Sequence, residues 1–166
     1  PPKKSSGFTT TGGDSAQTSN LVRNGYETYG ENVTVGVLSD SYNNLGGANA
    51  DVSRDDLPGV GNVANNLNPV YVPTGWDFPY TVFNHATDEG RAMLQIVHDV
   101  APKAKLAFRT GFVSEGDFAL GVRQLADAIL IGPVGNDDKR LPRQLTLVAE
   151  RDGFHDRVVE AGAATK

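Results

Sequence analysis

Two carboxylates occupy positions in the chain where catalytic groups commonly collect. Asp40 directly follows a short apolar run, Val33–Leu38, and Glu89 lies in the first turn of a stretch with helical spacing that begins near Thr87. In open parallel sheets, sites form beyond the carboxyl ends of the strands, where loops meet the N-termini of helices. If this strand and this helix are neighbours, Asp40 and Glu89 face one cleft, where a carboxylate could act as a general base.

Each of the two residues also has an ordinary structural explanation. An aspartate after a strand is a common turn residue, because its side chain bonds to the nearby backbone. A glutamate in the first turn of a helix interacts favourably with the helix dipole. The spacing of Asp40 and Glu89 alone therefore leaves a functional and a structural interpretation open.

The apolar patterning predicts the elements that would position the two carboxylates. Thr87 is the expected cap of a helix whose apolar residues recur at intervals of three and four until Pro102 ends it. The other expected elements are strands at Val33–Leu38, Ala104–Arg109 and Ile129–Val134 and a helix at Ser114–Asp127. This alternation predicts an α/β fold in three layers, with a mostly parallel sheet and helices on both faces.

The chain divides by composition into three parts. Residues 1–19 are rich in Ser, Thr, Gly and Pro and are expected to form a flexible arm. Residues 20–138 contain the alternating strands and helices and form the predicted α/β domain. Residues 139–166 are rich in charged side chains and are expected to form a divergent, helical tail.

The composition excludes several classes of function. The 166 residues are 39% hydrophobic, enough for a core, and the absence of cysteine excludes disulfide scaffolds, thiol nucleophiles and thiolate metal sites. A net charge of −5 disfavours nucleic acid as a partner, because binding to phosphates needs many cations. No apolar run approaches the roughly 20 residues of a membrane span. The first residue, Pro1, is followed by no signal sequence.

Two segments resemble the subtilisin-like serine peptidases. VTVGVLSDSYNN (Val33–Asn44) is similar to their first catalytic segment, a strand that ends in the catalytic aspartate. DEGRAMLQIVHDVAPKAKLAF (Asp88–Phe108) is similar to the second, a helix that runs on to a Val-Ala-Pro strand entry. The two segments together most resemble a sedolisin-like branch of secreted bacterial proteins with this fold, over residues 30–130.

The resemblance implies a partial subtilisin-like domain for serine-type proteolysis of a peptide or protein, without a cofactor, outside the cell or at its surface. Asp40 takes the position of the subtilase aspartate, and Gly90 matches the glycine that follows the histidine. Glu89 takes the place of that histidine, which is the solution that sedolisins use. A glutamate has an ordinary pKa of about 4.3, so a glutamate base favours acidic working conditions.

The nucleophile of these families has no counterpart in the sequence. They take their serine from a Gly-Thr-Ser segment, which does not occur here, and Ser39 and Ser41 lie at the exit of the aspartate strand. Met93 stands where sedolisins place an orienting aspartate, one helical turn after the glutamate. This chain is therefore expected to be inactive in proteolysis by itself, because the acyl-enzyme needs a positioned hydroxyl.

Other functions remain open from the sequence. The missing serine and Met93 also suit a non-catalytic, subtilase-like module of a large secreted or surface protein. An unrelated ligand-binding α/β domain would instead have a pocket near Asn43–Asn68, and Asp40 and Glu89 would not lie close together. No metal site is expected, because the 3 histidines lack ligand spacing and the acidic loop Asp51–Asp56 lacks the pattern of a calcium-binding loop.

Overall fold

The computed structural model describes residues 9–79, 86–131, 145–149 and 159–161. The chain is a mixed α/β protein whose sheet has the strand order β2–β1–β3–β4. The strands are β1 (Thr34–Ser39), β2 (Lys105–Thr110), β3 (Leu145–Ala149) and β4 (Val159–Ala161). β1 pairs in parallel with β2 and with β3, whereas β4 pairs antiparallel with β3. The predicted α/β class is therefore confirmed.

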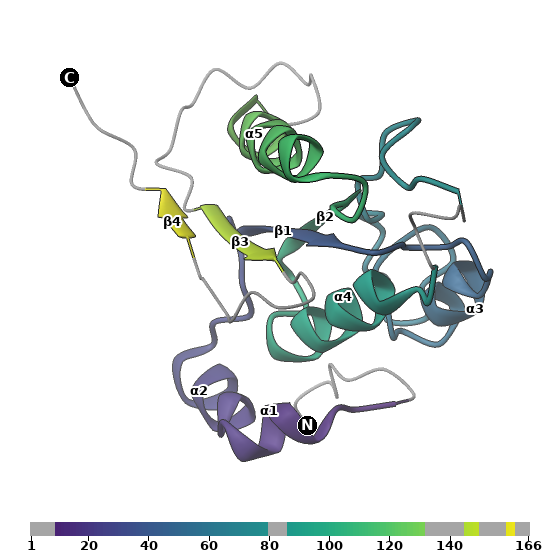
Figure 1. The fold of residues 1–166 in the computed structure, drawn as a ribbon. Coiled ribbons are helices and arrows are strands. Elements are labelled where there is room, and N and C mark those ends of the chain that lie inside the picture. Colours follow the sequence, from purple (N-terminus) through teal and green to yellow (C-terminus); the bar gives the residue numbers. More distant parts are fainter. Residues whose placement is uncertain (1–8, 80–85, 132–144, 150–158, 162–166) are drawn as a thin grey trace.

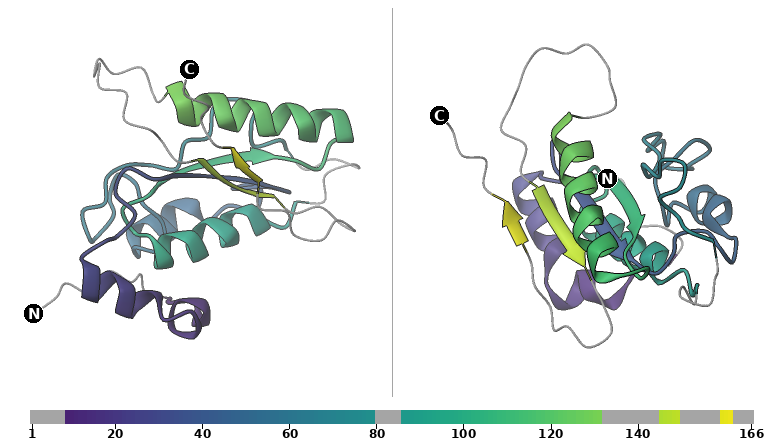
Figure 2. Two further views of the ribbon diagram at one scale, coloured as in Figure 1. Left: turned by 90° about the vertical axis from the view of Figure 1, so that its left-hand side faces the viewer. Right: turned by 45° about the horizontal axis from the view of Figure 1, so that its top comes forward.

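Helices lie on opposite sides of β1 and β2. The helices are α1 (Gly12–Ala16), α2 (Ser19–Tyr26), α3 (Ala48–Ser53), α4 (Glu89–Val100) and α5 (Glu115–Ile131). Figure 1 shows α4 on one face of β1 and β2 and α5 on the other, and Figure 2 shows α1 and α2 beyond α4. Within the described part of the chain, no helix combines the length and the apolar character needed to cross a membrane.

The core follows the alternation of side chains along the strands. Val35 and Val37 of β1 point to the face that α4 covers, where they join Leu94 and Phe108 in the larger apolar cluster. Leu38 points to the opposite face and packs in a second cluster with residues of α5, such as Leu125. β1 is therefore buried on both faces, as expected of a central parallel strand.

The strand predicted at Ile129–Val134 is wrong for its first residues. α5 continues through Ile131, and residues 132–134 lie outside the described part of the chain. A short apolar run has the same signature in a buried strand and in a buried helix, so periodicity alone does not separate them. Here the run simply extends the helical spacing of Phe118, Val122 and Leu125, whose side chains face the sheet.

The helical tail predicted for residues 139–166 is also corrected. The described residues of this segment are strands, β3 and β4, and β3 lies beside β1 in the sheet. LTLVA is rich in β-branched and apolar residues, which favour a strand. The open edge of β1 supplies its pairing partners.

The flexible arm predicted for residues 1–19 is corrected for its described part. Residues 1–8 lie outside the described residues, but α1 begins at Gly12 and packs against α4. Asp14 is buried and forms a two-pronged ion pair with Arg23 of α2, with distances of 2.6 and 2.7 Å. The same guanidinium donates to the carbonyl of Val100 at 2.9 Å, which fastens α2 to the end of α4. A composition-based argument misses these long-range contacts.

Candidate functional site

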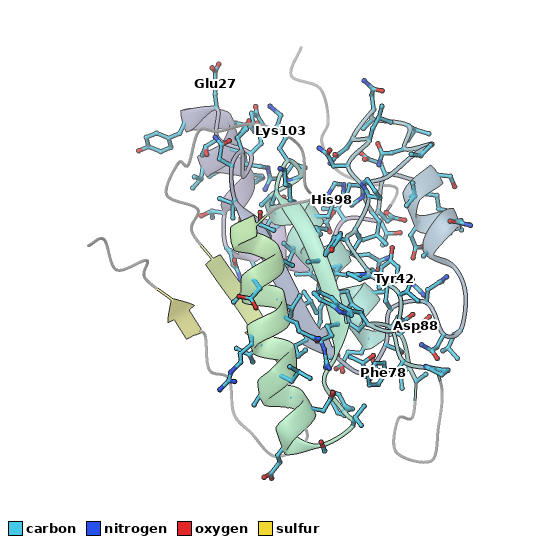
Figure 3. The ribbon with its side chains drawn as sticks, turned by 90° about the horizontal axis from the view of Figure 1, so that it is seen from above. Glu27, Tyr42, Phe78, Asp88, His98 and Lys103 are labelled. Atoms are coloured by element: carbon cyan, nitrogen blue, oxygen red, sulfur yellow. The ribbon has the colours of Figure 1, made fainter. Side chains whose placement is uncertain are left out.

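The carboxyl end of β1 meets the N-terminus of α4 at one edge of the sheet. Ser39 is the last residue of β1, Asp40 follows it, and Glu89 is the first residue of α4. Figure 3 shows the neighbouring Tyr42, Phe78 and Asp88 at this end of the molecule, and Glu27 and Lys103 at the other. The structure therefore brings together the elements that carry the two candidate carboxylates.

Asp40 is buried and accepts hydrogen bonds from the turn that leads into α4. Oδ2 accepts from the backbone N–H and, at 2.7 Å, from the hydroxyl of Thr87. Oδ1 accepts from the N–H of Ser41 at 2.5 Å and from the N–H of Gly90 at 3.4 Å. Thr87 therefore does not cap α4 with its side chain as predicted, because its hydroxyl is bonded to Asp40.

These hydrogen bonds control the ionisation of Asp40. Burial acts to raise the pKa of its carboxyl, but the donors on Thr87, Ser41 and Gly90 outweigh burial and lower the pKa below its ordinary value. The charge also lies at the N-terminus of α4, where the helix dipole favours an anion. Asp40 is therefore a fixed anion that holds the start of the helix that carries Glu89.

Glu89 is half-buried and is held by the last residue of β1. The hydroxyl of Ser39 donates to Glu89 Oε2 at 3.1 Å. Among the described residues, no hydrogen bond joins Glu89 to Asp40, although Asp40 accepts from the N–H of Gly90, the next residue in the helix. Asp40 and Glu89 thus both lie where the carboxyl end of β1 meets the start of α4.

Asp88 organises the loop that follows β1. It precedes α4 in a left-handed conformation with φ 56° and is buried. Its carboxylate accepts from Ser41 Oγ at 3.0 Å and from the N–H groups of Asn44 and Leu45 at 2.8 and 3.1 Å. Sequence reasoning assigned Asp88 to the first turn of the helix, because nothing local signals contacts more than forty residues away.

Arg91 balances part of the negative charge beside the site. Its guanidinium pairs with Asp88 and, through Nε at 2.9 Å, with Asp51 of α3. It also donates to the carbonyl of Tyr42 at 2.8 Å. The guanidinium of Arg91 is therefore bonded to three groups of the protein. Asp51, the first residue of the acidic loop considered for calcium, forms an ion pair with Arg91.

The remaining sequence candidates do not complete a catalytic group. Met93 packs against the apolar cluster between the sheet and α4, so its position offers no orienting group to Glu89. Ser39 and Ser41 are fully buried, which keeps both hydroxyls from a substrate. Among the described residues, no cluster of three or more potential ligands could hold a metal ion. His85 and His155 lie outside the described residues.

His98 lies away from the site, within α4. It is buried, with Nε2 3.6 Å from Asp55 Oδ1, and its Nδ1 has no hydrogen-bond partner among the described residues. Burial lowers the pKa of His98, although the nearby carboxylates of Asp55, Asp99 and Asp56 act in the opposite direction. His98 is therefore a buried, packed side chain of α4.

The lowered pKa predicts a loss of stability in mild acid. A histidine whose folded pKa lies below its unfolded value of about 6.5 contributes stability above that pH, and the contribution falls as the pH drops toward the folded pKa. Between about pH 7 and pH 5, His98→Gln is expected to lose less free energy of unfolding than the unsubstituted chain. Urea unfolding of both proteins measures this, and equal losses would contradict the prediction.

The chemistry available at the edge is that of a hydrogen-bonded carboxylate base beside a fixed anion. Glu89 keeps Oε1 without a hydrogen-bond partner among the described residues, so this oxygen can receive a proton. Comparisons with protein-family models, with curated proteins and with solved structures found no match for this chain. The residues of the site and the resemblance of its two segments are therefore the features from which a function can be proposed.

Proposed function

We propose that the chain is part of a serine-peptidase domain of the subtilisin type, in its sedolisin-like form, acting on peptides or proteins outside the cell or at its surface. The observation that carries the proposal is the juxtaposition of Asp40 and Glu89 at the carboxyl end of β1. These are the two positions that the resemblance assigns to the peptidase site. The finer fold assignment, a three-layer subtilisin-like domain, belongs to the same proposal.

Glu89 is the general base in this proposal. It would take the proton of a serine hydroxyl as the serine oxygen attacks the scissile carbonyl, and would return the proton to the leaving amine. Asp40 supports Glu89 by holding the first turn of α4 through the N–H groups of Thr87 and Gly90. The serine is supplied by sequence other than Ser39 and Ser41, which are buried.

The proposal is tested in the complete protein encoded by the reading frame that contains this sequence. Glu89→Gln keeps the shape of the side chain but removes the base, so peptide hydrolysis is expected to fall about a hundredfold or more. Glu115→Gln is the matched control, because Glu115 is the first residue of α5 as Glu89 is of α4. Equal activity in the Glu89→Gln and unsubstituted proteins would overturn the assignment of the base.

A second candidate is a non-catalytic module with the same fold, in which the edge is a structural remnant. The observation that favours it is the burial of the Ser39 and Ser41 hydroxyls, together with an apolar Met93 in place of an orienting carboxylate. The same assay decides between the two functions. A complete protein that cleaves no peptide in acid or neutral buffer supports the module.

A further inference from the structure

The direction of the Ser39 side chain follows from the pleat of β1. Val35 and Val37 point toward α4, and Ser39, two residues further on, continues this face. Glu89 is the first residue of the helix on that face. The 3.1 Å hydrogen bond from Ser39 Oγ to Glu89 Oε2 is therefore built by the two elements that form the core.

Asp40 cannot supply this contact, because its oxygens already accept from Thr87, Ser41 and Gly90. Two ionised carboxylates also repel each other, whereas a hydroxyl can donate to either oxygen of an ionised carboxylate. The hydroxyl of Ser39 is the only side-chain donor to Glu89 among the described residues. The role that the subtilisin pattern gives to an aspartate is thus open to Ser39.

We infer that Ser39 is the positioning residue of Glu89, an inference that rests on the proposed function. A glutamate side chain has several rotamers, and a fixed donor at Oε2 selects one of them. The selected rotamer leaves Oε1 to receive the proton. Ser39 is fully buried, so it acts on Glu89 and not on a substrate.

The first test uses the chain by itself and measures the side-chain rotamers of Glu89 by NMR, from the scalar couplings of its Cβ protons. Ser39→Ala removes the donor to Oε2, so Glu89 is expected to populate several rotamers instead of one. Ser39→Thr keeps the hydroxyl and is expected to restore the single rotamer. Unchanged couplings in Ser39→Ala would overturn the inference.

Thr110→Val is the matched control for lost stability. Thr110 pairs with Ser39 across β1 and β2, is equally buried, and accepts a hydrogen bond from the N–H of Phe78 instead of contacting Glu89. This variant removes a buried hydroxyl at the same end of the sheet, so Glu89 is expected to keep its single rotamer. A loss of that rotamer as large as in Ser39→Ala would reduce Ser39 to a purely structural role.

The second test measures peptide hydrolysis by the complete protein. Ser39→Ala is expected to lower kcat about tenfold or more with KM within about twofold, and Ser39→Thr to recover most of the loss. Undiminished kcat in Ser39→Ala would overturn the positioning role. The failures are distinguishable, because a complete protein without peptidase activity refutes the proposed function, while the NMR couplings of Glu89 still decide whether Ser39 holds its side chain.

Discussion

Gly90→Ala is expected to destabilise the fold by about 3 kcal/mol, a large part of the roughly 5–15 kcal/mol that stabilises a small domain. A Cβ at this position would lie 2.2 Å from Cε2 of Phe108 and 2.8 Å from the backbone oxygen of Ser41. Phe108 is fully buried in the larger apolar cluster, and a backbone oxygen cannot rotate away. The start of α4 would have to move outward, away from β2.

Urea unfolding of Gly90→Ala against the unsubstituted chain measures this effect. Gly116→Ala is the matched control, because Gly116 lies in the first turn of α5 and a Cβ there would meet nothing within 4 Å. That substitution is expected to be neutral or to stabilise by up to about 1 kcal/mol, through the better helix propensity of alanine. Equal stabilities of the two variants would refute the argument from packing.

The crowding at Gly90 also explains how the site is held. The missing side chain lets the first turn of α4 approach β2 and the residue after Asp40 closely enough for the Gly90 N–H to reach the Asp40 carboxylate. The same close approach of α4 to the sheet fixes the position of Glu89, the residue before Gly90. The resemblance pairs Gly90 with the glycine after the subtilase histidine, and the structure gives a steric reason for a glycine at this place.

The central elements could be predicted because their signals are local. Val33–Leu38 is a short apolar run between polar residues, and β1 occupies Thr34–Ser39. The three-four spacing of Met93, Val97 and Val100 placed α4 within two residues of its start. The meeting of Asp40 and Glu89 then followed from the rule that parallel strands present their carboxyl ends to helix N-termini.

The remaining parts of the fold depend on contacts that local patterns do not encode. Asp14 is ordered by Arg23 and by the packing of α1 on α4, and Thr11 donates its N–H to Asp99 at 2.7 Å across 88 positions of sequence. The end of α5 was mistaken for a strand because a short apolar run fits both states. The many charged side chains of residues 139–166 favour a helical prediction. The short apolar run Leu145–Ala149 instead forms β3, because it pairs with β1.

The contact between Ser39 and Glu89 could have been predicted from the sequence. Side chains alternate along a strand, so Ser39 shares the face of Val35 and Val37, which is the face that α4 covers. The serine was considered only as a nucleophile, and its burial excludes that role in this structure. The partners of Asp40 could not be foreseen, because the turn at Asp88 is left-handed and places Thr87 against the carboxylate.

Asp40→Ala is expected to cost about 3 kcal/mol of unfolding free energy at neutral pH. The substitution leaves the N–H groups of Thr87, Ser41 and Gly90 without their acceptor, and two of these residues are buried. A buried donor that loses its partner forfeits a hydrogen bond without regaining water. Asp40→Asn, which keeps one acceptor oxygen, is expected to lose less, and urea unfolding of both variants measures the order.

The pH dependence separates the charge of Asp40 from its shape. Burial alone would raise the pKa of this carboxyl, but its hydrogen-bond donors lower it overall, so the folded state favours the anion. The stability that the anion contributes is therefore fully present above the unfolded pKa of about 3.9 and is lost as the pH falls through the folded pKa. The difference between Asp40→Ala and the unsubstituted chain should stay constant from neutral pH to about pH 5 and shrink toward about pH 3.

Glu31→Ala is the control for Asp40→Ala, because it removes an exposed carboxylate instead of a buried one. The Glu31 side chain is 40% exposed and pairs with Lys103 at the surface, so its loss is expected to cost less than about 0.5 kcal/mol at any pH in this range. A gap for Asp40→Ala that is as small as this, or that fails to shrink in acid, would mean that the Asp40 anion does not hold the start of α4. The base at Glu89 would then lack the support that the proposed mechanism gives it.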